Sequence, residues 1–123
     1  MRVTLHSPLV QRRTPERSAF TLTARFFDDS SDVWSASTPT TADYRIDRIR
    51  VGDPSCYQEV LGWTSLSPAT SNSIAITAAQ NAITNDCVRD QQMQVTVRAN
   101  ADLSTQTQAT YRYAVTNLAA QAA

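Results

Sequence analysis

The sequence contains no lysine, one histidine, two cysteines and two glycines among its 123 residues, and these shortages exclude several classes of function. All eleven basic residues are arginine, and eleven acidic residues balance them to a formal net charge of zero. A chain without excess positive charge has no general attraction for nucleic acid or for an anionic membrane surface, so we expect neither as a partner. No run of about 18 apolar residues is present, so no membrane-spanning helix is expected.

Catalytic and metal-binding patterns are also missing. The single histidine, His6, lies near the N-terminus, so no Ser-His-Asp or Cys-His arrangement has a base inside the predicted domain. Asp28, Ser30 and Asp32 match only the beginning of a calcium-binding loop, because Val33 stands where the turn glycine belongs. We therefore predict no catalytic residue, no metal site, no cofactor and no enzymatic activity.

The two cysteines, Cys56 and Cys87, match no metal-ligand spacing. The N-terminus shows no apolar run followed by a cleavage site, which favours synthesis and retention in a bacterial-type cytoplasm. In such a reducing compartment two cysteines are more often free thiols than a bridge. Both states of the pair remain open at the level of the sequence.

Apolar residues at every second position predict a series of short β-strands. Residues 44–63 are predicted to form a hairpin around the turn formers Gly52–Ser55, and the other apolar runs are expected to cover it. Further strands are predicted over residues 19–26, 73–77, 92–99 and 110–116. Thr77 is expected to cap one or two helical turns over residues 78–83.

The connections between these strands are too short for parallel crossovers. The pattern therefore predicts an all-β fold, an immunoglobulin-like antiparallel β-sandwich with about seven strands and one short helical turn. Residues 18–118 are assigned to this sandwich and residues 119–123 to a flexible C-terminal tail.

Residues 1–17 are assigned to a basic, proline-broken N-terminal arm. A short edge strand is compatible with Val3 and Leu5, but Pro8 and Pro15 limit its length. The arm either stays mobile or pairs with the sheet edge of a neighbouring molecule. Its arginines are the predicted interaction residues: Arg2, Arg12, Arg13 and Arg17.

Large aromatic side chains are predicted to pack in the core, because a small sandwich needs bulky residues and a tyrosine hydroxyl can reach the backbone at its ends. They are Trp34, Trp63, Tyr44, Tyr57, Tyr111 and Tyr113. The alternative interpretation of these residues is a platform on which sugars or bases stack.

The order of several sequence blocks resembles a group of small immunoglobulin-like proteins encoded among the virion genes of tailed bacteriophages. The likeness covers about residues 19–118, and its blocks are Tyr44–Asp47, Glu59–Thr64, Ser73–Thr77 followed by Ala79–Ile83, Val95–Val97 and Tyr111–Leu118. The resemblance implies a structural protein of the virion, made in the host bacterial cytoplasm, which decorates the capsid or bridges head, connector and tail components.

The partners that the resemblance implies are other virion proteins, namely capsid, portal or adaptor, or tail components. Many copies in a symmetric assembly are expected, held by protein–protein contacts. The alternative function is a carbohydrate- or receptor-binding module on a tail fibre or a cell surface.

Overall fold

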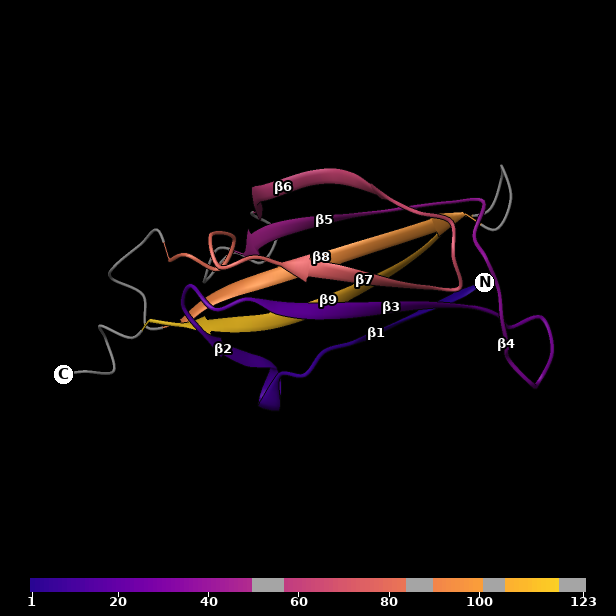
Figure 1. The fold of residues 1–123 in the computed structure, drawn as a ribbon, viewed down its shortest axis with the longest axis horizontal. Helices are drawn as coiled ribbons and strands as arrows, with labels where there is room; N and C mark the ends of the chain where they lie inside the picture. Colours follow the sequence, from indigo (N-terminus) through magenta and orange to yellow (C-terminus); the bar gives the residue numbers. More distant parts are fainter. Residues whose placement is uncertain (50–56, 84–89, 101–105, 118–123) are drawn as a thin grey trace.

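The computed structural model describes residues 1–49, 57–83, 90–100 and 106–117, which form two β-sheets packed face to face (Figure 1). The four-stranded sheet contains β1 (Arg2–His6), β3 (Phe20–Asp28), β4 (Ser35–Ala36) and β7 (Ser71–Ile76). The five-stranded sheet has the order β2 (Arg13–Pro15), β9 (Gln106–Thr116), β8 (Asp90–Asn100), β5 (Thr41–Ile49) and β6 (Tyr57–Leu66). A short 3₁₀ turn, η1 (Val10–Arg12), precedes β2. The predicted all-β architecture of two sheets is confirmed.

All but one of the strand pairs between described residues are antiparallel. In the four-stranded sheet β3 pairs with β1 on one side and with β7 and β4 on the other. In the five-stranded sheet β8 lies between β9 and β5, and β5 also pairs with β6. Among the strands of the described ranges, only β2 pairs in parallel, with β9.

Two central strands supply the middle of the core, because each places an apolar residue inward at every second position. On β3 these residues include Leu22 and Phe26, and on β8 they include Met93 and Val95, all fully buried. The ring of Phe20 meets the ring of Tyr113 edge-on, with 5.0 Å between the ring centroids. The inward residues predicted for 92–99 are confirmed.

The predicted hairpin is confirmed as the antiparallel pair β5–β6, whereas its turn, Gly52–Ser55, lies outside the described residues. Cys56 and Cys87 also lie outside them, so the question of a bridge stays open. The hairpin is not what the other strands cover, however. β6 is an edge strand of the five-stranded sheet. Two register shifts interrupt its pairing with β5 between Tyr44 and Asp47.

The segment 1–17 belongs to the sandwich and is not an arm beside it, which corrects the boundary drawn from the sequence. β1 pairs with β3 and buries Val3, and β2 pairs with β9 and buries Thr14. Pro15 is compatible with this pairing. The Glu16 N–H donates to the Thr116 carbonyl (3.0 Å), so alternation along β2 turns the Pro15 nitrogen away from β9, where no ladder donor is needed. The predicted tail, residues 119–123, lies outside the described residues.

A buried asparagine joins three segments at one end of the sandwich. The Asn81 Oδ1 accepts a hydrogen bond from the Tyr113 hydroxyl (2.6 Å), and its Nδ2 donates to the Ser18 carbonyl (2.6 Å). The backbone carbonyl of Asn81 accepts from the Arg17 N–H (3.0 Å). The side chain is completely buried, and both of its polar atoms are paired.

Asn81 is held in place by the turn that follows β7. The Thr77 hydroxyl accepts from the Gln80 N–H (3.2 Å), and the Gln80 Oε1 accepts from the Thr77 N–H (2.9 Å). This reciprocal pair has the pattern of a capping box, so Thr77 makes the predicted capping bond. It caps an isolated turn, however, and residues 78–83 do not form the predicted helical segment. The Asn81 N–H then donates to the Thr77 carbonyl (3.3 Å), which closes a single turn.

We expect Asn81→Ala to lower the free energy of unfolding by roughly 2 kcal/mol or more, because it leaves the buried Tyr113 hydroxyl and the partly buried Ser18 carbonyl without partners. Chemical denaturation measures this change. The control is Asn72→Ala, whose amide bonds the Ser67 carbonyl at an exposed position and whose loss should cost about 0.5 kcal/mol or less. Equal losses for the two variants would contradict the role assigned to Asn81.

Burial, with a smaller contribution from Tyr111, raises the pKa of the Tyr113 hydroxyl well above its ordinary value. The hydroxyl of Tyr113 therefore binds its proton more tightly in the folded protein than in the unfolded chain. The stabilisation is complete below the unfolded pKa of about 10 and is lost above it, by at most about 1.4 kcal/mol per pH unit. We expect Tyr113→Phe to be less stable at pH 8 and to lose less stability between pH 10 and 11. Parallel pH profiles for the two proteins would refute this.

Candidate protein-interaction surfaces

Polar side chains occupy the outer face of the five-stranded sheet, because they alternate with the inward residues of β5, β8 and β9. We call them, together with the indole of β6, the Trp63 surface. Its members are Asp43, Arg45, Asp47, Trp63, Gln94, Thr96 and Arg98.

Two bidentate ion pairs organise this surface. Arg98 donates from Nε and Nη2 to the two carboxylate oxygens of Asp43 (2.6 and 2.8 Å), directly across the β5–β8 ladder. Arg45 donates in the same way to Asp47, two residues along β5 (2.9 and 2.7 Å). The hydrogen bonds to the carboxylates, more than their charge alone, raise the pKa of both arginines above the ordinary value.

The indole of Trp63 lies against these arginines and is 38% exposed. The guanidinium carbon of Arg98 lies 3.7 Å from the ring centroid, and that of Arg45 lies 5.6 Å from it. A register shift places Gly62 and Trp63 opposite the single residue Arg45. Such an extra residue redirects a side chain, which accounts for an indole on the outer face of an edge strand.

Several polar groups of the Trp63 surface are buried although they lie outside the core. Arg112 donates from Nε to the Gln94 Oε1 (2.8 Å), and the Gln94 Nε2 donates to the Thr96 hydroxyl (3.3 Å). Asp47 is only 3% exposed. A hollow of about 320 Å³ lies beside them, and Gln108 and Thr110 of β9 complete its lining. The result is a hydrogen-bonded, charge-balanced platform around an exposed indole.

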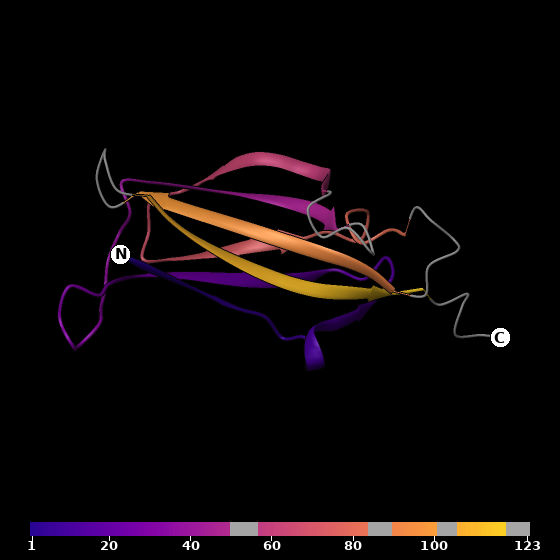
Figure 2. The same cartoon turned by 180° about the vertical axis from the view of Figure 1, so that it is seen from behind.

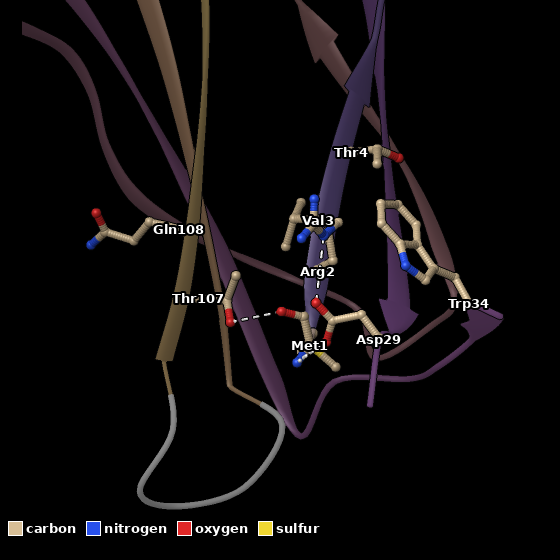
Figure 3. A pocket seen from close by; sticks show the side chains of 8 residues that line it. All are labelled: Met1, Arg2, Val3, Thr4, Asp29, Trp34, Thr107 and Gln108. Carbon is tan, nitrogen blue, oxygen red and sulfur yellow. Dashed lines mark hydrogen bonds and ion pairs between the residues drawn. The ribbon is translucent and has the colours of Figure 1, made fainter. Parts of the chain in front are cut away.

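A second surface lies where β1 meets the segment between β3 and β4 (Figure 3). Trp34 is 45% exposed, and the guanidinium carbon of Arg2 lies 4.4 Å from its ring centroid. Asp29 contacts the Arg2 Nε (3.5 Å), and a hydrogen bond from the N-terminal ammonium lowers the pKa of its carboxyl. A pocket of about 400 Å³ is lined by these residues and by Thr107 of β9, whose hydroxyl donates to the Met1 carbonyl (3.2 Å).

The four arginines predicted as interaction residues do not form one site. Arg2 stacks on Trp34, and the Arg12 guanidinium lies 4.9 Å from the Tyr111 ring centroid. Arg13 pairs with Asp90 (3.0 Å), while Arg17 contacts the Asn81 turn through its backbone. Each of the four arginines therefore has a different neighbour, and the four do not share a surface.

The prediction that the large aromatic residues pack in the core is correct for some and wrong for others. Tyr111 and Tyr113 are buried, and Tyr44 is partly buried against the core. Trp34 and Trp63 are exposed, which contradicts the prediction for both. In the sequence, the glycine before Trp63 could have indicated that its side chain is exposed, because a glycine inside a strand pattern often marks a bulge. The side chain of Tyr57 lies outside the described part of the structure.

No group of three or more His, Cys, Asp or Glu side chains within residues 1–49, 57–83, 90–100 and 106–117 is arranged to hold a metal ion. His6 lies on β1 and pairs in register with Thr23. None of the helical segments in the described ranges has the length and apolar character to cross a membrane. The predicted absence of enzymatic activity stays a prediction.

No protein-family model, no curated protein and no solved structure matches the chain.

The stacking of Arg98 on Trp63 predicts a measurable protection of the indole. In a Trp34→Phe background, where Trp63 is the only tryptophan, we expect Arg98→Ala to increase quenching of the fluorescence by acrylamide. Stability should change little, because the ion pair is partly exposed. Arg25→Ala, an exposed change on the other sheet, is the matched control. Unchanged quenching in Arg98→Ala would show that the stack does not persist in solution.

Proposed function

We propose that this chain is an immunoglobulin-like structural protein of a bacteriophage particle, which decorates the capsid or bridges head, connector and tail components. It acts by binding neighbouring proteins and carries out no reaction. The virion context is supported by the resemblance of the ordered sequence blocks between residues 19 and 118.

The strand order supports the immunoglobulin-like part of the proposal. β1, β3 and β7 correspond to strands A, B and E of such a sandwich, and β9, β8, β5 and β6 correspond to G, F, C and an additional C′ strand. The first strand is divided between the layers, since β1 pairs with β3 and β2 pairs with β9. Because one fold serves many functions, the role itself is argued from the surface.

The exposed indole of Trp63 between two arginines carries the proposal of protein binding. Tryptophan and arginine are the residues on which protein interfaces most depend. Here the carboxylates of Asp43 and Asp47 already hold both guanidinium groups in place. Less side-chain entropy is therefore lost when a partner binds. The two arginines and two aspartates balance in charge, which favours recognition by shape and contact over long-range attraction.

Carbohydrate binding is the second candidate, and the same surface supports it. An exposed indole beside Asp47, Gln94 and Arg45 offers stacking together with planar hydrogen-bonding groups. Arg98, however, lies 3.7 Å from the ring centroid and covers one of the two faces on which a sugar would stack. A Trp63-dependent signal on a glycan array would favour this candidate over protein binding.

Mass spectrometry of purified virions tests the proposed function. We expect the chain to be present, in hundreds of copies if it decorates the shell and in six or twelve if it lies at the tail junction. Trp63→Ala should reduce incorporation roughly thirty-fold, the equivalent of about 2 kcal/mol at a central interface residue. Val10→Ala, at an exposed apolar position on η1, should leave incorporation unchanged.

Absence of the chain from purified particles would overturn the virion role. Normal incorporation of a folded Trp63→Ala protein would instead exclude the Trp63 surface as the contact.

A further inference from the structure

The two sheets cover each other unevenly. In Figures 1 and 2, β7, β3 and β1 overlie the β8, β9 and β2 part of the five-stranded sheet, whereas no described strand of their sheet overlies β6. Apolar residues of β6 reflect this, since Val60, Leu61 and Leu66 pack against the core but are only partly buried. The inner side of β6 therefore lacks a facing strand among the described residues.

The neighbouring edge of the other sheet, β7, is open as far as the described residues go. β7 pairs with β3 on one side, and no strand in the described part of the chain pairs with its second side. The Phe26 N–H donates to the Thr70 carbonyl (3.0 Å), one position beyond the pair Arg25–Ser71. Because bonded positions alternate along an antiparallel ladder, Asn72, Ile74 and Ile76 direct their backbone groups towards β3. The backbone groups of the residues between them, Ser71, Ser73 and Ala75, face away from the sheet.

Three common protections against strand pairing are missing from β7 itself, namely a charge, a proline and a bulge. β7 contains no charged residue and no proline, and its register with β3 is regular. The edge of β6 is different, because two register shifts interrupt it and Glu59 is exposed there. Natural proteins protect free edges with such charges and bulges. Of these two edges, the open one of β7 is the better template for an added strand.

We propose that β7 accepts an extended segment of a neighbouring protein as an added strand of the four-stranded sheet. The added strand pairs with the outward backbone groups of Ser71, Ser73 and Ala75, and its inward side chains cover the inner side of β6. This inference builds on the proposed function as a protein-binding structural domain and specifies a second contact, made through the main chain.

The surroundings define the chemistry of the added strand. Its inward positions must be apolar at every second residue, because they meet Val60, Leu61 and Leu66 of β6. On the outer side, Arg25 is exposed, is in register with Ser71 and makes no ion pair with a described residue. An acidic outward residue near the Ser71 end of the added strand would complement this charge.

A second copy of this chain does not fit as the occupant. In each copy, β6 extends past the edge of β7 (Figure 1). If the β7 strands of two copies paired, the five-stranded sheets of both copies would meet at the line of pairing. The two β6 strands would then compete for the same space. A single extended segment, without a sheet of its own, avoids this conflict.

Ser73→Pro tests the added strand selectively, because it removes an N–H that faces away from β3 and spares the β3–β7 ladder. We expect the folded variant to enter particles about ten-fold less than the natural chain, and Ser73→Ala to enter normally. Ala75→Lys, which places a charge at the same edge, is a second variant with the same expected loss and needs no change of backbone.

Hydrogen exchange of the unmodified chain gives a readout independent of any variant. The backbone amides of Ser73 and Ala75 should exchange rapidly in the isolated protein and at least about a hundred-fold more slowly in assembled particles. Rapid exchange in particles, or normal incorporation of Ser73→Pro and Ala75→Lys, would overturn the proposed strand. If Trp63→Ala is still excluded from particles in that case, the proposed function stands without it. A dimer of the isolated chain that Ser73→Pro abolishes would also overturn it, in favour of pairing between copies.

Discussion

The buried amide of Asn81 is the interaction on which the arrangement of the two sheets depends. It bonds the Tyr113 hydroxyl of β9 and the Ser18 carbonyl just before β3, while its own backbone belongs to the turn after β7. Leaving the buried Tyr113 hydroxyl unpaired would cost more than the net contribution of an ordinary hydrogen bond. The amide therefore fixes the point at which the chain passes from β2 in one sheet to β3 in the other.

The five-stranded sheet has two chemically different faces. Its inner face is apolar and closes the core, and its outer face carries the ion pairs Asp43–Arg98 and Arg45–Asp47 around an exposed indole. Partly exposed ion pairs contribute little to stability. Their importance lies in holding the guanidinium groups against Trp63, which supports a role in recognition. The open edge of β7 belongs to the other sheet, so a neighbour bound at both places would contact both layers.

Local pattern was sufficient for the strands that cross the core. The alternation around Leu22 on β3 and around Val95 on β8 predicted which side chains are inward, because successive residues of a strand must face opposite sides. It was insufficient for the candidate site. Trp63 is exposed because of a register shift between β5 and β6, and Arg98 reaches it across a ladder of residues far apart in the sequence. Gly62 is the one local sign of the register shift, and no spacing of neighbouring residues predicts that Arg98 lies against the indole.

The sequence by itself determined the all-β class, the β5–β6 hairpin, the capping role of Thr77 and the apolar faces of the central strands, since each depends on residues within a few positions of one another. Only the tertiary structure decided that residues 2–6 and 13–15 join opposite sheets, that two tryptophans are exposed, and that one edge of β7 is unpaired among the described residues. The physical reason is that the burial and hydrogen bonding of the whole chain together select which strands pair. The alternation of neighbouring residues along one strand does not specify its partner.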